Sequence, residues 1–189
     1  MRTYSLYSIM KEELRNGSRD LASRSSGNVV RERIEKVIKK EREGEIIALD
    51  FSRIGIIDYS CADEVVAILI SRLWCNEYGD KYIILTGMNE NQKENIEVAL
   101  ERRGLAVMAA LKKGEKKVLG NLNNYLKETL QYIVNNDKIT AKELSKIKNI
   151  EANTSGTRLL NLHKKRLVKR IDEKKNGGRV WVYEKLKGK

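Results

Sequence analysis

The sequence predicts two domains: an α/β domain over residues 1–115 with a mostly parallel or mixed sheet, and an α+β domain over residues 120–189. In the first part, short apolar runs rich in β-branched residues alternate with segments of helical length, as in α/β proteins. In the second part, three amphipathic segments precede two strand-like runs. Gly and Lys in residues 111–123 predict an exposed linker between the domains.

The elements of the first domain follow from its apolar pattern. Residues 46–51 and 82–85 are short, β-rich and almost wholly apolar, which predicts buried parallel strands. A weaker strand at the sheet edge is expected over residues 3–7. Apolar residues at helical spacing predict helices over residues 28–42, 61–77 and about 91–103.

The second domain is expected to begin with a helix that ends near Asn135 and Asn136, because apolar residues recur at spacings of three and four before that point. Thr140 and Glu143 form a capping-box pattern that begins a short second helix. A third helix is expected from about Thr154, with Leu159, Leu162 and Leu167 directed inward. Its outer face is expected to carry Ser155, Arg158, Asn161 and Lys165.

Two strands, residues 168–173 and 179–185, are expected after the third helix. The glycine-containing segment 174–178 between them predicts a hairpin turn. Trp181 and Tyr183 share one face of the second strand, and we expect both to cover the helices. The alternative is a stacking platform for single-stranded nucleic acid, which requires that these aromatic rings be exposed.

The charge is distributed unevenly along the chain. The formal net charge is +12, yet residues 120–189 alone carry 17 basic and 7 acidic residues. Such a concentration of cations indicates a polyanionic partner, because each Lys or Arg that meets a phosphate releases condensed counterions. The alternative is a lysine-rich surface that is merely solvated.

The second domain resembles the winged helix-turn-helix family. The resemblance rests on ITAKELSKIKNIEANTSGTRLLNLHKKRLVKRI and on GGRVWVYEK. The family often has Gly immediately before the Leu-Val pair that opens the wing, whereas this chain has Arg166. In the family the third helix enters the major groove and the wing contacts the adjacent backbone or minor groove.

This resemblance implies duplex DNA as a partner. It implies contacts to base edges from Ser155, Thr157, Arg158 and Asn161. It implies contacts to phosphates from Lys164, Lys165, Lys174, Lys175 and Arg179. Many winged helices bind proteins instead or only pack subunits together, so a protein partner, including a second copy in a homodimer, is the alternative.

In the first domain the informative segment is GEIIALDFSRIGIIDYSCADEVVAILISRL, where a buried strand leads through a turn to a helix. Ser60 is expected to be the helix N-cap, with Asp63 in an acidic first turn. The segment resembles STAS and STAS-like domains of anti-sigma factor antagonists. That resemblance implies a protein partner, such as a kinase-like ATPase, and phosphorylation at Ser60.

The same segment supports a simpler interpretation. Ser60 could be an ordinary helix cap, and Cys61 and Ala62 depart from the small Ser/Gly pattern of the better known antagonists. Asp63 and Glu64 are candidates to bind basic groups of a partner, or they simply favour the helix dipole. Asp58 completes this candidate phosphorylation or partner site.

Other function classes lack the necessary residues. The chain has one histidine, His163, and two cysteines without a CxxC pair, so we expect no catalytic, metal or cofactor site. No apolar run approaches the roughly 20 residues of a membrane helix. We expect a cytosolic DNA-binding transcriptional regulator whose STAS-like domain receives a signal. The alternative is a partner-switching scaffold.

Overall fold

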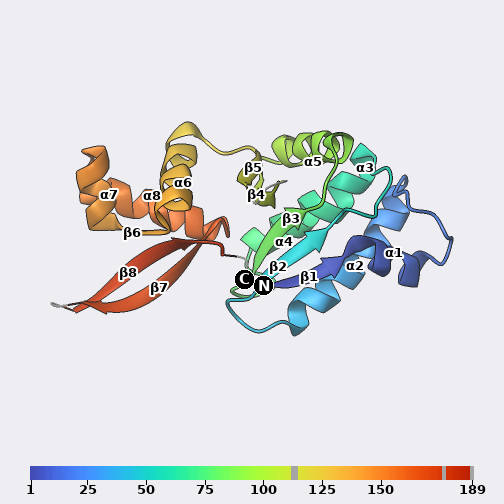
Figure 1. Cartoon of the computed structure of the whole chain (residues 1–189), viewed down its shortest axis with the longest axis horizontal. Coiled ribbons are helices and arrows are strands. Elements are labelled where there is room, and N and C mark those ends of the chain that lie inside the picture. Colours follow the sequence, from blue (N-terminus) through green and yellow to red (C-terminus); the bar gives the residue numbers. More distant parts are fainter. Residues whose placement is uncertain (112–114, 176–177, 188–189) are drawn as a thin grey trace. The chain divides into compact units, whose positions relative to one another are not determined.

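A computed structural model describes residues 1–111, 115–175 and 178–187, with the Lys175 side chain outside that description. The chain divides into two compact units, Met1–Leu122 and Asn123–Gly188. Both units combine helices with a sheet (Figure 1). Within the residues that the structure describes, no helix has the length and apolarity needed to cross a membrane.

The first unit is built on a mixed five-stranded sheet in the order β1-β2-β3-β4-β5. Its first four strands run parallel and β5 pairs antiparallel with β4. The bounds are β1 (Arg2–Ser5), β2 (Ile46–Asp50), β3 (Tyr82–Thr86), β4 (Ala106–Ala110) and β5 (Lys116–Gly120). The first four residues of β2 and of β3 are buried, as the apolar runs predicted.

Helices connect the parallel strands, as expected of an α/β unit. α1 contacts α2, α2 contacts the π-helical segment η1, and η1 contacts α5, so the helices form one layer. Their bounds are α1 (Leu6–Leu14), α2 (Arg24–Lys40), α3 (Tyr59–Ala62), η1 (Asp63–Ala67), α4 (Ile68–Trp74) and α5 (Glu90–Arg102). Leucine, isoleucine and valine side chains from this layer and from β2, β3 and β4 form a single buried core.

Of two predictions at the edges of this sheet, one is confirmed and one is wrong. The expected edge strand is β1, which pairs with β2 and ends at Ser5, whose hydroxyl accepts the Ser8 N–H and begins α1. The expected linker over residues 111–123 contains β5, in which Leu119 is fully buried. Lysines conceal this strand in the sequence, because charged residues are the usual occupants of an edge strand.

The second unit has three helices and a three-stranded antiparallel sheet in the order β6-β8-β7. Its elements are α6 (Asn124–Asn136), β6 (Lys138–Thr140), α7 (Ala141–Lys148), α8 (Ala152–Lys164), β7 (Val168–Lys175) and β8 (Gly178–Lys185). The capping box of Thr140 and Glu143 is confirmed at the start of α7. In the predicted turn between β7 and β8, residues 176–177 lie outside the described residues.

The end of α8 explains how the chain turns without the glycine of the winged-helix pattern. Arg166 takes a left-handed backbone conformation with φ 58°. The Arg166 N–H donates to the His163 carbonyl at 2.8 Å and the Leu167 N–H to the Leu162 carbonyl at 3.0 Å. This is the Schellman pattern of a helix C-terminus, in which glycine is usual at the left-handed position. The turn therefore forms although a non-glycine residue, whose Cβ atom strains this backbone conformation, occupies the left-handed position.

Candidate functional site

The helical segment after β2 begins at Asp58 rather than at Ser60. The Asp58 carboxylate accepts the Cys61 N–H at 2.7 Å and the Ser60 hydroxyl at 2.9 Å. Asp58 has extended backbone and directly precedes Tyr59, the first helical residue. The prediction of Ser60 as the N-cap is therefore wrong, because an aspartate two residues earlier already caps the helix. Ser60 is half-buried in the first turn.

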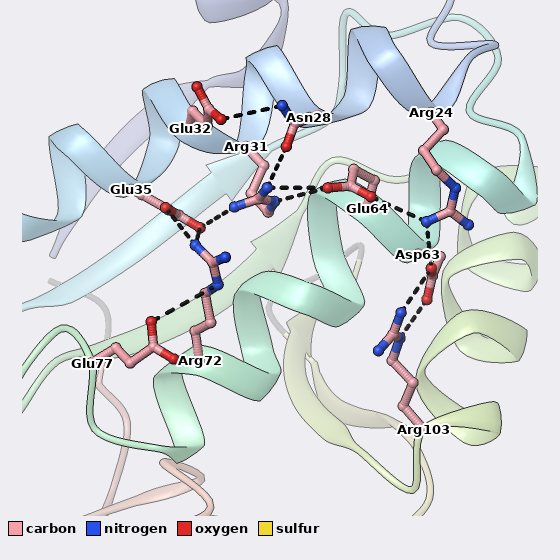
Figure 2. A network of polar contacts seen from close by, with 10 residues as sticks. All are labelled: Arg24, Asn28, Arg31, Glu32, Glu35, Asp63, Glu64, Arg72, Glu77 and Arg103. Carbon is pink, nitrogen blue, oxygen red and sulfur yellow. Dashed lines mark hydrogen bonds and ion pairs between the residues drawn. The ribbon is translucent and has the colours of Figure 1, made fainter.

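Asp63 and Glu64 are buried, and both bind arginines of the same unit (Figure 2). Asp63 accepts hydrogen bonds from Arg103, the C-cap residue that follows α5, at 3.0 Å and from Arg24 of α2 at 3.1 Å. Glu64 accepts from Arg24 and from Arg31 of α2, each at 3.1 Å. The hydrogen bonds from Arg103 lower the pKa of Asp63, against the effect of burial.

The network continues along α2 and reaches α4. Arg31, itself buried, also donates to Glu35. Arg72 of α4 donates to the two Glu35 carboxylate oxygens at 2.8 and 3.0 Å. Figure 2 shows Arg31 between the carboxylates of Glu35 and Glu64. These contacts join α2, η1, α4 and the end of α5, so Asp63 and Glu64 hold the helical layer together. Both carboxylates are already paired with arginines of the same unit.

The helices approach closely where this network forms. A Cβ atom added at Gly27 of α2 would lie 3.1 Å from the Glu64 Cβ and 3.4 Å from the Cys61 Cα. Glycine thus lets α2 pass close to η1 and brings Arg24 and Arg31 to the carboxylates. π-Helical turns are frequent at functional sites. Here the π-helical turn places two acidic side chains against two neighbouring helices.

Cys61 is a packed thiol beside this network. Its thiol donates to the Ser23 carbonyl at 2.8 Å, and burial raises its pKa to about 11. A reactive cysteine needs a lowered pKa, so this side chain acts as a small buried residue. Among the described residues, no group of three or more His, Cys, Asp or Glu side chains could hold a metal ion.

In the second unit, α8 presents a polar face that differs from the expected one. α8 begins at Ala152, earlier than the expected Thr154. Ser155 is fully buried, and its hydroxyl donates to the Ala141 carbonyl at 2.8 Å, so it cannot approach a base edge. Ser155 lies four residues before the buried Leu159 and so shares its face, a signal that the sequence contained.

The other residues predicted to contact DNA from α8 and its C-terminal end differ in exposure and in their contacts. Thr157 and Lys164 are exposed and Asn161 is half-buried. Exposed Asn153 was not predicted as a site residue because α8 begins before the expected Thr154, and it lies one turn before Thr157. Arg158 instead places its guanidinium 5.1 Å from the ring centroid of Tyr125 in α6. Burial lowers the pKa of the half-buried Lys165.

We call β7 and β8 together the basic hairpin. Its predicted cations Lys174 and Arg179 are exposed, while the Lys175 side chain lies outside the described residues. The Arg179 side chain is 75% exposed and lies 3.3 Å from the Asp172 carboxylate. Trp181 is 49% exposed and Tyr183 only 5%, so the expectation that both aromatic rings cover the helices is wrong for Trp181.

Comparison with known proteins identifies no relative of this chain. No family model matches the chain, and neither a curated protein nor a solved structure is significantly similar to it.

Proposed function

We propose that the chain is a DNA-binding regulator in which the second unit binds duplex DNA. The observation that carries this proposal is the polar outward face of α8, followed directly by the basic hairpin. Three helices and a hairpin are the parts of a winged helix, in which the third helix enters the major groove. The surplus of cations in residues 120–189 supplies the attraction to phosphates.

The exposed residues suggest distinct roles within this interface. We assign base contacts in the major groove to the amides of exposed Asn153 and half-buried Asn161 and to the Thr157 hydroxyl, which donates to the Asn153 carbonyl and can still accept. We assign phosphate contacts to Lys164, at the end of α8, and to Lys174 and Arg179 in the basic hairpin, because all three are exposed cations. Arg158 would have to leave the Tyr125 ring to reach guanine, so we assign it no base contact.

Titration of the full chain against labelled duplex DNA tests this proposal. Affinity should fall by about 40-fold between about 50 and about 200 mM salt, as expected for three phosphate contacts. Lys164→Ala and Lys174→Ala should each reduce the salt slope by about one unit. Lys11→Ala, an exposed lysine of the first unit, is the matched control and should change nothing. Absence of duplex binding at low salt would overturn the proposal.

For the first unit we propose a STAS-like role in receiving a protein partner, with Ser60 as the site of the signal. A large apolar side chain, Ile56, is 64% exposed on the loop that leads to Asp58. A single exposed apolar side chain is common on protein surfaces, so the support for this proposal comes from the resemblance of the segment around Ser60 to STAS-like domains. The other candidate function, a partner-switching scaffold without DNA binding, depends on this same loop.

The contact between Ser60 and Asp58 suggests how phosphorylation would act. A phosphate on Ser60 would remove the hydroxyl that Asp58 accepts at 2.9 Å and would place a second negative charge beside that carboxylate. The start of the helical segment would then loosen, despite its favourable dipole. Hydrogen exchange at Tyr59–Ala62 in phosphorylated and unmodified protein measures this effect. Unchanged protection, with no phosphate found on Ser60 from the native cell, would remove Ser60 as the signal.

A further inference from the structure

One face of the basic hairpin combines cations with aromatic rings. The strand register pairs Lys174 with Arg179, Asp172 with Trp181, and Arg170 with Tyr183. Side chains of directly paired residues point to the same side of a sheet, and every second pair shares that side. These three pairs therefore lie along one face of the two strands, which we call the ladder.

Burial changes along the ladder. Tyr183 is buried, whereas Trp181 is half exposed. The Arg170 guanidinium lies 3.7 Å from the centroid of the Trp181 ring, a cation–π contact that covers the ring from one side. Leaving half of an indole in water forgoes much of the favourable free energy of burying it, since aromatic side chains bury 150–250 Å² when packed. Trp and Arg are also the residues most enriched at the centres of binding interfaces.

The surroundings of Trp181 indicate the chemistry of its partner. The exposed side chains of Arg179 and Lys174 follow it along the ladder, and Asp172 is directly opposite. Arg179 lies 3.3 Å from the Asp172 carboxylate, and an apolar protein surface would remove these charged groups from water at a cost in free energy. A nucleotide supplies both a flat π-face for the indole and a phosphate for the cations.

A paired base does not suit this site. Bases within a duplex already stack on their neighbours, and taking one out of the stack costs a few kcal/mol. An unpaired base has a free face and loses no pairing when it stacks on an aromatic side chain.

We propose that Trp181, backed by Arg170, is a stacking site for an unpaired base, so that the basic hairpin recognises single-stranded DNA next to the duplex. This inference rests on the proposed DNA binding by the second unit. It adds that the site prefers a duplex with a single-stranded extension to the same duplex with blunt ends.

Tryptophan fluorescence of the full chain tests the site. The chain has two tryptophans, so Trp74→Phe leaves Trp181 as the sole indole reporter. This variant is titrated with a blunt duplex and with the same duplex carrying a short thymidine overhang. Affinity is followed through a label on the DNA, and stacking through quenching of Trp181.

The overhang should bind about 5- to 150-fold more tightly than the blunt duplex, since stacking of one base is worth about 1–3 kcal/mol. It should also quench Trp181. Trp181→Leu in the full chain should abolish the preference and leave blunt-duplex affinity unchanged. Trp181→Tyr should retain most of the preference, because tyrosine also stacks. Circular dichroism and blunt-duplex binding check that both variants fold.

The outcomes separate this inference from the proposed function. Equal affinities for the two DNAs without quenching of Trp181 would overturn the stacking site and leave duplex binding intact. If the Trp181→Leu variant still prefers the DNA with the overhang, the stacking site is likewise overturned. Failure to bind either DNA at low salt would overturn the proposed function and with it this inference.

Discussion

At the scale of single residues, Arg31 is a buried cation that links two acidic side chains of the first unit. It binds Glu64 and Glu35, and its side chain is only 6% exposed. Removing one partner from a buried ion pair leaves an uncompensated charge, which costs about 3–5 kcal/mol. Arg31→Met should therefore lower the free energy of unfolding by about 3 kcal/mol, measured by urea denaturation followed through circular dichroism.

Arg33, two positions further along α2, is the matched control for Arg31. It pairs with Glu12 and Glu13 at 3.4 and 3.3 Å, but its side chain is 38% exposed. Exposed ion pairs contribute about 0–1 kcal/mol, so Arg33→Met should have a small effect. Similar losses for the two variants would show that the buried network does not stabilise the first unit more than a surface pair does.

The lowered pKa of Asp63 predicts a dependence of stability on pH. A carboxyl whose pKa is lower in the folded than in the unfolded protein stabilises the fold above its unfolded pKa. That contribution disappears as pH falls through the lowered, folded value. Asp63→Asn should therefore lose less unfolding free energy than the wild type between neutral pH and the acid range below the ordinary aspartate pKa. Equal acid dependence of the two proteins, measured by denaturant titration at several pH values, would contradict the prediction.

At the scale of elements, the left-handed Arg166 sets the turn between α8 and β7. A left-handed conformation costs a residue with a Cβ roughly 1–2 kcal/mol, a penalty that glycine avoids. Glycine loses more chain entropy on folding, by about 0.4–1 kcal/mol, which reduces the gain. Arg166→Gly should consequently be more stable than Arg166→Ala by about 1 kcal/mol.

The alanine variant is the proper reference, because both changes remove the arginine side chain and only one relieves the backbone. Thermal denaturation of the two full-length variants compares them directly. If Arg166→Ala equals or exceeds Arg166→Gly in stability, the helix does not end in the left-handed turn described above.

The sequence predicted elements well where local pattern decides them. The apolar runs of β2 and β3, the capping box of α7 and the hairpin strands all follow from periodicity and capping chemistry. It failed where tertiary contacts decide. The lysines of β5 hide the pattern of an edge strand that pairs with β4. No local sequence pattern predicts the π-helical turn, which depends on the close approach of α2 at Gly27 and on the arginines of α2.

The candidate sites show the same division. Exposure of Thr157, Lys164, Lys174 and Arg179 follows from charge and polarity. Burial of Asp63 and Glu64 does not, because their arginine partners are about 33 to 40 positions away in the sequence. Strand periodicity predicts that Trp181 covers the helices together with Tyr183. Periodicity identifies a face but not how far along the hairpin the helices cover it.

At the scale of the whole molecule, the division at Leu122 gives the last prediction. The core of the first unit includes Leu119 of β5, which is fully buried, and β5 pairs with the whole of β4. A fragment of residues 1–122 keeps this strand, whereas a fragment of residues 1–115, which ends where the sequence placed the boundary, loses it. Both fragments lack the second unit, so the difference between their free energies of unfolding measures the contribution of β5.

Losing β5 removes the Leu119 side chain from the core and leaves the backbone of β4 unpaired along that edge. Truncating a buried leucine alone costs about 2–5 kcal/mol, so the shorter fragment should be less stable by at least that amount. Leu119→Ala in the longer fragment should reproduce the side-chain part of the loss while keeping the strand. Urea denaturation of the three proteins ranks them. Equal stability of the 1–115 and 1–122 fragments would move the boundary back to residue 115 and make β5 part of a linker, since a strand that belongs to the core cannot be removed without cost.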